Sequence, residues 1–213
     1  MRLTVFGATG RTGVPLVRQA LDRDHEIRAL VRAPARASAL PADGERLVLV
    51  EGDLLDPAAV RSAVDGGEAV VNVSGPAKGS PADLQQRATA AIVDAMTAEG
   101  IRRVVTLTGA GVSVPWDRPK PVDRVFGILL RLVQRQVLAD SEAAVRAVRA
   151  SDLDWTVVRV PRLTDAPPRG RWRVAPGVGA GTGTQLSRAD LAAFLLDTVE
   201  SGGHVAELPV VSW

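Results

Sequence analysis

The chain contains no cysteine and no tyrosine, and it has only two histidines. Without cysteine it forms no disulfide, offers no thiolate to zinc and has no cysteine nucleophile, and this absence fits a reducing compartment. The histidines, His25 and His204, lie far apart in the sequence, with no acidic cluster at metal-ligand spacing around them. Zinc sites need clustered ligands, so we expect no metal site.

Long hydrophobic runs are also missing. No stretch of about eighteen apolar residues is free of charge, so we expect no membrane-spanning helix. The most apolar run, residues 125–138, is interrupted by Arg131 and Arg135, and we interpret it as a buried helix or as one that faces a partner. The first residues pass directly into a strand-like run with no room for a signal peptide, and we therefore expect a cytoplasmic protein. The sequence indicates no oligomeric state.

Aromatic residues make up only 3% of the chain, and 26 basic residues against 24 acidic ones give a net charge of +2. The basic residues are almost all arginines, and they are spread along the sequence instead of being gathered in runs. Surfaces that bind nucleic acid concentrate basic side chains and interleave aromatic ones. We therefore expect no nucleic-acid partner and interpret most of the arginines as solvated surface residues.

The sequence does contain short β-branched runs that alternate with segments of helical length. This alternation predicts βαβ units in a doubly wound parallel sheet, and nearly continuous apolar strands indicate helices on both faces. At 213 residues, the chain fits a single α/β domain spanning residues 1–213. The expected strands lie at residues 3–6, 27–31, 47–50, 69–73, 104–107, 156–160 and 206–211, and the expected helices at 14–23, 57–65, 81–99, 141–150 and 188–201.

Two segments rich in proline and glycine break the alternation, around residues 111–121 and 161–186. Long irregular segments after late strands often carry binding residues, so we expect both to form the substrate side of the domain. Trp116 and Trp172 lie in these segments. We interpret both as packing residues, with a flat face for a planar acceptor as the alternative.

A glycine-rich turn follows the first expected strand and precedes the first expected helix. In such a turn one glycine permits the tight bend, the second lets the backbone approach a pyrophosphate, and the third lets the helix pack on the sheet. Gly7, Gly10 and Gly13 have this spacing and context. The free N–H groups at the helix N-terminus then bind phosphate. The predicted binding turn consists of Gly7, Thr9, Gly10, Arg11, Thr12 and Gly13.

The residue that ends the second strand selects the dinucleotide. An acidic side chain there bonds a 2′-hydroxyl, whereas arginine pairs with a 2′-phosphate. Arg32 holds this position, Arg36 follows it, and Arg11 is expected to approach the same phosphate from the turn. The sequence therefore predicts NADP(H), with solvent-exposed arginines as the alternative. Asp53 and Leu54 follow the third strand, where the adenine is expected, although Asp53 also suits a loop cap.

These segments together resemble one family. They are similar to the NAD(P)H-binding, NmrA-like atypical short-chain dehydrogenases/reductases, which include the biliverdin-IXβ/flavin reductase type. The matching segments are the turn at residues 7–13, Val-Arg-Ala-Pro-Ala-Arg at 31–36, Gly-Asp-Leu at 52–54, Asp-Trp-Thr-Val-Val-Arg at 154–159 and Pro-Arg-Leu-Thr at 161–164. The resemblance implies a Rossmann sheet of about seven strands in the order 3-2-1-4-5-6-7. It also implies nicotinamide contacts at the ends of the fourth, fifth and sixth strands, which here are Ser74, Gly75, Thr108, Gly109, Val160 and Pro161.

The chain departs from that family at the catalytic positions. With no tyrosine present, proton transfer by a Tyr-x-x-x-Lys pair is excluded. Gly109 replaces a serine that is common after the fifth strand, and Ser141 replaces a lysine that often follows the residue equivalent to Asp140. Val160 replaces a frequent proline. We therefore name no catalytic residue; Thr108 and Ser113 are the nearest hydroxyls and are interpreted as structural.

Hydride transfer to an acceptor that is itself an electron sink needs little from the protein beyond positioning and desolvation. We therefore expect an NADPH-dependent reductase of a planar acceptor, such as a flavin, a quinone or a tetrapyrrole, with protons supplied by water. The alternative is an NADP(H)-binding sensor or regulator without turnover, as the NmrA-like resemblance permits. An extended short-chain epimerase or dehydratase ranks last, because both its tyrosine and its substrate domain are missing.

Overall fold

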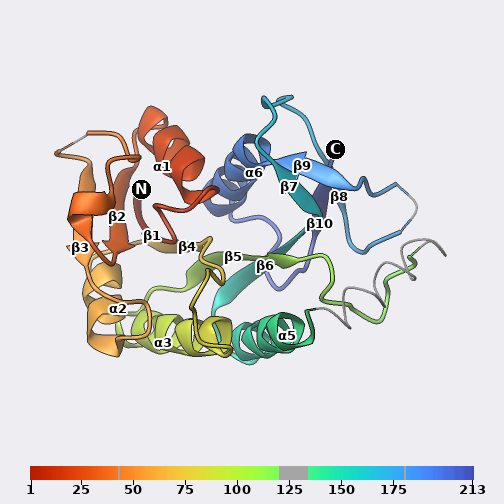
Figure 1. Cartoon of the computed structure of the whole chain (residues 1–213), viewed down its shortest axis with the longest axis horizontal. Helices are drawn as coiled ribbons and strands as arrows, with labels where there is room; N and C mark the ends of the chain where they lie inside the picture. The colour runs from red at the N-terminus through yellow and green to blue at the C-terminus, as the bar shows by residue number, and fades with distance from the viewer. Residues whose placement is uncertain (43, 120–133, 180) are drawn as a thin grey trace.

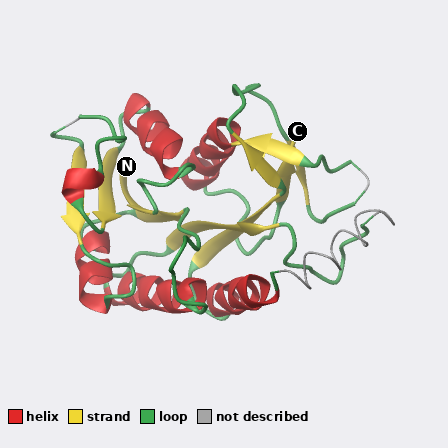
Figure 2. Ribbon diagram, viewed as in Figure 1, coloured by secondary structure: helices red, strands yellow, loops and turns green. Residues whose placement is uncertain are grey.

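The computed structural model describes residues 1–42, 44–119, 134–179 and 181–213 as an α/β fold of three layers (Figure 1). A central sheet lies between two layers of helices, and the layers are clearly separated in Figure 2. Two helices cover one face, α1 (Gly13–Asp22) and α6 (Arg188–Ser201). The other face is covered by α2 (Pro57–Val64), α3 (Leu84–Ala98) and α5 (Arg135–Arg149).

The main sheet has eight strands in the order β3-β2-β1-β4-β5-β6-β10-β8. The first seven of these are parallel to one another, and β8 pairs with β10 in the antiparallel direction. The strands are β1 (Arg2–Phe6), β2 (Glu26–Val31), β3 (Leu47–Glu51), β4 (Ala69–Asn72), β5 (Arg103–Gly109), β6 (Asp154–Val160), β8 (Arg173–Ala175) and β10 (Val210–Ser212).

The predicted Rossmann order is confirmed, with β10 as the seventh strand, but the count is eight because β8 extends the edge. A second sheet pairs β7 (Arg162–Thr164) with β9 (Gln185–Ser187) in parallel. Of the three additional strands, β7 and β8 lie within the expected irregular segment 161–186, and β9 begins at its end. Each is only three residues long and lies among prolines and glycines, so sequence periodicity could not mark them.

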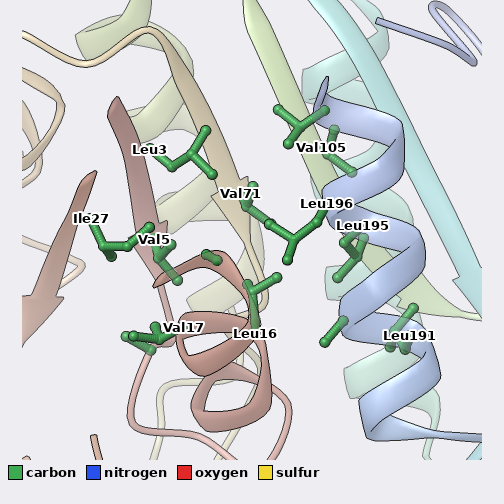
Figure 3. Close-up of a cluster of buried hydrophobic side chains, with 14 of the residues drawn as sticks. Leu3, Val5, Leu16, Val17, Ile27, Val71, Val105, Leu191, Leu195 and Leu196 are labelled. Carbon is green, nitrogen blue, oxygen red and sulfur yellow. The ribbon is translucent and has the colours of Figure 1, made fainter. Parts of the chain in front are cut away.

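The apolar strands are explained by burial on both faces of the sheet. In β1, Leu3 and Val5 belong to the core beneath α1 and α6, whereas Phe6 belongs to the core beneath α2, α3 and α5. Figure 3 shows the first core, where leucines from α1 and α6 meet the valines of the central strands. Because successive side chains of a strand point to opposite faces, a strand covered twice is mostly apolar, and its buried Thr4 is accommodated by a hydrogen bond from its hydroxyl to the Ala63 carbonyl at 3.0 Å.

The five expected helices are present, with two changed starts. α3 begins at Leu84 instead of 81, and the Asp140 carboxylate accepts hydrogen bonds from the backbone N–H groups of Gln85 and Gln86, both at 2.9 Å. α5 begins at Arg135 instead of 141 and so includes the end of the apolar run 125–138. Residues 125–133 of that run lie outside the described residues.

The predicted start of α6 is confirmed. The Ser187 hydroxyl accepts a hydrogen bond from the Asp190 N–H at 3.0 Å, and Gly202 ends the helix with a φ of 66°. Trp155 is buried, as expected of a core residue. No helix in the four described ranges combines the length and apolarity needed to cross a bilayer. Within the same ranges, no three His, Asp or Glu side chains gather into a possible metal site.

Candidate functional site

The turn between β1 and α1 requires glycine at two positions. Gly7 has a φ of +82°, and a Cβ there would lie 2.6 Å from the backbone nitrogen of Ser74. A Cβ on Gly13 would lie 2.1 Å from the carbonyl oxygen of Gly7. Real Cβ atoms do not approach backbone this closely, so no side chain fits at either position. These distances agree with the roles in bending and helix packing that the sequence predicts for the two glycines.

Gly10 lies in a different environment. Its N–H donates to the Gly7 carbonyl at 3.0 Å and closes the turn, and a Cβ would meet only that carbonyl oxygen, at 3.1 Å. Apart from this one atom, the structure leaves room for a small side chain on Gly10. Packing within the chain therefore gives a weaker reason for glycine here than at Gly7 or Gly13, and a further reason is needed. A ligand that approaches the backbone supplies such a reason.

The N-terminus of α1 presents unpaired backbone donors. In the described part of the chain, no carbonyl accepts from the N–H groups of Arg11, Thr12 or Gly13, and the N-cap Thr12 makes no side-chain cap. The first turn of a helix carries a partial positive charge, and its free N–H groups bind anions. The turn and the helix mouth together therefore fit a diphosphate.

Arg32 follows β2 directly, and its side chain is exposed. Pro34–Arg36 form one 3-10 turn after it, but the side chain of Arg36 lies outside the described parts of the structure. The fold brings one acidic residue to this end of the sheet, because Glu51, the last residue of β3, lies opposite Val31. The sequence did not reveal Glu51 as a neighbour, since the two strand ends are joined only by the parallel pairing of β2 and β3.

The structure directs Arg11 away from the end of β2. Its guanidinium forms an ion pair with Asp165, which also accepts a hydrogen bond from Arg188 at 2.8 Å. The hydrogen bond from Arg11 and the charge of Arg188 lower the pKa of the Asp165 carboxyl below its usual value. Asp165 directly follows β7, so this contact connects the glycine-rich turn to the segment 161–186.

Asp53 acts locally as a loop cap. Its carboxylate accepts a hydrogen bond from the N–H of Leu55 at 2.8 Å, and its carbonyl accepts from the N–H of Asp56 at 3.0 Å. Leu54 is half-buried and packs against the core beneath α2 and α3. The loop-cap interpretation of Asp53 therefore has direct structural support, while an adenine contact by Asp53 or Leu54 stays a prediction.

The ends of β4, β5 and β6 lie side by side, as the predicted strand order requires. Ser74 donates its N–H and its hydroxyl to the side-chain oxygen of Asn72, at 3.0 and 2.6 Å. Gly109 pairs with Val160 in the parallel register, and the N–H of Ala110 donates to the Val160 carbonyl at 2.8 Å. The residues that the structure brings to this edge are Ser74, Gly75, Thr108, Gly109, Val160 and Pro161.

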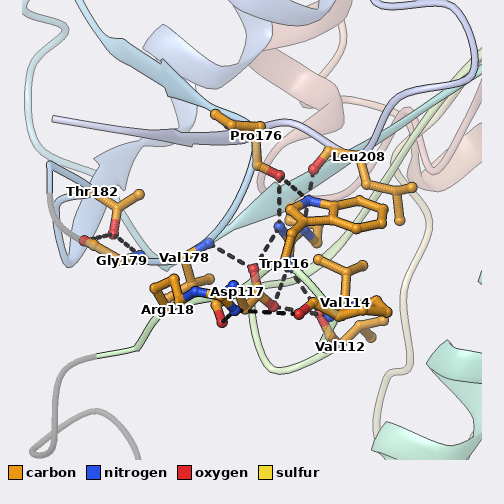
Figure 4. Close-up of polar contacts among 12 residues, drawn as sticks. Val112, Val114, Trp116, Asp117, Arg118, Pro176, Val178, Gly179, Thr182 and Leu208 are labelled. Carbon is orange, nitrogen blue, oxygen red and sulfur yellow. Dashed lines mark hydrogen bonds and ion pairs between the residues drawn. The ribbon is translucent and has the colours of Figure 1, made fainter.

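Arg159 connects the two segments rich in proline and glycine, and sequence reasoning missed it. Its side chain is fully buried in β6 and forms a bidentate ion pair with Asp117, at 2.8 and 3.0 Å (Figure 4). The same guanidinium donates to the carbonyl oxygens of Val112, Pro176 and Leu208. One side chain therefore joins the segment after β5, the segment after β8 and the start of β10.

Asp117 completes this assembly. Its carboxylate also accepts from the backbone N–H groups of Val114 and Val178, at 2.9 and 2.7 Å. Burial by itself would raise the pKa of Asp117, but the hydrogen bonds from Arg159 and from the two N–H groups lower it below its usual value of 3.8. The carboxylate is therefore held in its charged form.

The two tryptophans of the segments rich in proline and glycine have different surroundings. Trp172 packs edge-on against Phe194 of α6, with ring centroids 6.1 Å apart, which agrees with the packing interpretation. Trp116 is exposed, and its Nε1–H donates to the Pro176 carbonyl at 2.7 Å. It borders a surface pocket of about 470 Å³ together with His204 and Glu207, which lie beyond β6 toward the edge of the sheet.

Comparison with known proteins agrees with this geometry. A family model described as NAD(P)H-binding matches residues 7–201. The photosystem II assembly factor Ycf39 of Cyanophora paradoxa is 32% identical over 108 residues, which are 49% of this chain and 33% of that protein. The chain therefore matches only about a third of that relative's length.

Two solved structures share the whole fold. A wide-type short-chain dehydrogenase/reductase of Veillonella parvula DSM 2008, in complex with NADP, has a TM-score of 0.82 at 22% identity and covers 100% of this chain and 94% of its own. ChuY, an anaerobillin reductase of Escherichia coli O157:H7, has a TM-score of 0.82 at 18% identity and covers 100% of this chain and 97% of its own. At these identities the likeness concerns the fold alone.

Proposed function

Because the chain belongs to the NAD(P)H-binding family, we propose that it is an NADPH-dependent reductase that transfers hydride to a planar electron acceptor without a Tyr-Lys pair. The observation that carries this proposal is the glycine-rich turn: no side chain fits at Gly7 or Gly13, packing gives a weaker reason for glycine at Gly10, and the helix mouth offers unpaired N–H groups. A dinucleotide diphosphate accounts for all of these features at once.

The remaining predicted contacts follow the sheet edge. The 2′-phosphate is assigned to Arg32 and Arg36. Arg11 joins them when its guanidinium leaves Asp165 and pairs with the phosphate. The adenine is assigned to Asp53 and Leu54. The nicotinamide, which supplies the hydride, is assigned to the edge formed by the ends of β4, β5 and β6. There the protein holds the acceptor in place and shields it from bulk solvent, which suffices when the acceptor stabilises the electrons itself.

The acceptor wall is assigned to the segments 111–121 and 161–186, within one domain that spans residues 1–213. The contacts of Arg159 support this assignment for the described parts of the wall, since they fix residues 112–117 against 176–178. Residue 180 and residues 120 and 121 lie outside the described residues. ChuY, which shares this fold, is named an anaerobillin reductase. We place tetrapyrroles first among the proposed acceptor classes to be tested.

The decisive experiment measures binding and turnover separately. Binding of NADPH and NADH to the full chain is followed by quenching of tryptophan fluorescence, and NADPH oxidation is then measured with flavins, quinones and biliverdin. We expect tight NADPH binding and oxidation with at least one acceptor. Binding without turnover by any acceptor would favour the sensor, an alternative that rests on the lack of tyrosine. If neither NADPH nor NADH binds, both the reductase proposal and the sensor alternative are overturned.

The phosphate preference gives a sharper prediction. Arg32→Ala should weaken NADPH binding at least about tenfold, or roughly 1.4 kcal/mol, because a charge-assisted bond to phosphate is lost. NADH binding should change little. Glu51, next to this position, remains available to a 2′-hydroxyl. Titration of both nucleotides checks the prediction, with Arg18→Ala, an exposed arginine on α1, as the matched control. Equal losses for NADPH and NADH would refute the phosphate assignment.

A further inference from the structure

A small polar cavity lies below the ends of β4 and β5, between the sheet and helices α3 and α5. Its volume is about 20 Å³, and seven of the twelve residues that line it are polar. A water molecule needs roughly 10–15 Å³ of such space and two to four polar partners. The cavity therefore has the size of a single water molecule, and no lining residue carries a charge.

The hydroxyl of Thr108 needs a hydrogen-bond partner inside this cavity. Its side chain is only 4% exposed and lines the cavity, and its hydroxyl has no hydrogen-bond partner in the described protein. A buried hydroxyl without a partner is costly, and native proteins satisfy almost all such groups. The missing partner must be small and neutral, and it must form hydrogen bonds.

Two other hydroxyls of the lining already have hydrogen-bond partners. The Ser141 hydroxyl donates to the Val137 carbonyl at 2.8 Å and accepts from the Gln85 amide, also at 2.8 Å. The Thr106 hydroxyl donates to the Asn72 backbone carbonyl at 3.3 Å. Hydroxyl oxygens keep free lone pairs when they donate, so these groups still offer acceptors to a bound donor. The hydrogen-bonding demand comes from Thr108, and the neighbours complete a water site.

We propose that this cavity binds one ordered water molecule and, resting on the proposed function, that this water donates the proton that completes acceptor reduction. Ser74 lines the cavity and lies against the glycine-rich turn, and Thr108 precedes Gly109 at the predicted nicotinamide edge. Hydride delivers two electrons to the acceptor. An O–H bond of the water then breaks, its proton goes to the reduced acceptor, and solvent returns a proton to the hydroxide.

The water site is tested on the protein without cofactor, by comparing Thr108→Val with Thr108→Ser. If water is bound, valine removes one of its partners, so the melting temperature of Thr108→Val should fall by a few degrees while Thr108→Ser stays close to the parent. A crystal structure of the parent should show a water within about 3.2 Å of the Thr108 hydroxyl, and Thr108→Val should lose it. A dry cavity gives the opposite result: valine removes an unsatisfied hydroxyl, the melting temperature stays or rises, and no water density is seen.

The proton-donor role has its own readout. With an accepted substrate, Thr108→Val should lower kcat at least about tenfold and raise the solvent deuterium isotope effect, because proton delivery becomes limiting. Because Thr108 is also a predicted nicotinamide contact, kcat is measured at saturating NADPH, so that a change in NADPH affinity does not enter the comparison. If kcat and the isotope effect match those of the parent, the donor role is wrong while the reductase function stands. If no acceptor is reduced, the reductase function fails and the melting and crystallographic results still decide the water site.

Discussion

Gly10→Val should abolish nucleotide binding while the protein stays folded. We expect the dissociation constants of both NADPH and NADH to rise at least about 100-fold, or roughly 3 kcal/mol, because the valine side chain would occupy the path of the diphosphate. The fold should tolerate the change: a Cβ at this position meets one atom at 3.1 Å, and the hydrogen bond from the Gly10 N–H to Gly7 is a backbone bond. Fluorescence titration measures the loss of nucleotide affinity, and thermal unfolding measures the stability of the variant.

Two further glycine variants make this result specific. Gly10→Ala adds only the Cβ and should give an intermediate loss of affinity. Gly13→Ala should instead destabilise the fold, because its Cβ would lie 2.1 Å from the Gly7 carbonyl oxygen. Retained nucleotide affinity in a folded Gly10→Val protein would show that the turn does not bind the diphosphate, and the proposed function would lose its main support.

The sequence predicted the parts of the molecule that depend on local pattern. The glycine-rich turn is visible because three glycines, a preceding apolar strand and a following helix all lie within a short stretch. The parallel sheet is visible because strands such as β1, with Leu3 and Val5 facing one core and Phe6 the other, must be apolar on both faces. In both cases, the cause of the structure lies within the segment itself.

The contacts that sequence reasoning missed join distant segments. Arg159 and Asp117 are 42 positions apart, and Arg11 and Asp165 are 154 apart. An arginine in a strand usually indicates an exposed position, because buried charges are rare unless they are paired. No local pattern shows where the partner lies. The role of Asp53 as a loop cap was correctly named as an alternative, since its partner Leu55 is only two residues away.

Arg159→Met should produce the largest loss of stability. Breaking a buried ion pair by removing one partner costs about 3–5 kcal/mol, because the other charge stays buried without its counterion. Here the variant also leaves the carbonyls of Val112, Pro176 and Leu208 without this donor. We therefore expect the melting temperature to fall by roughly 10 °C for a domain of this size. Urea unfolding and calorimetry measure the change.

The exposed pair between Arg102 and Asp154 provides the matched control. Its side chains are 63% and 41% exposed, against 0% and 9% for Arg159 and Asp117. Arg102→Met should therefore destabilise the protein far less than Arg159→Met, because solvent screens the exposed pair. Adding Asp117→Leu to Arg159→Met should recover part of the lost stability, because the unpaired carboxylate is removed. If the two single Arg→Met variants were equally stable, the buried pair would not hold the segments together.

The pH dependence of stability follows from the lowered pKa of Asp117. A carboxyl whose pKa is lower in the folded than in the unfolded chain contributes stability above its unfolded value, and that contribution is lost as the pH falls. The parent should therefore lose this part of its stability as the pH falls from above 3.8 through the lowered pKa. Arg159→Met removes the main charge that lowers it, so the variant should show a shallower decline in this range. Because the contacts of Arg159 hold the proposed acceptor wall together, the KM of the folded variant for an acceptor should also rise.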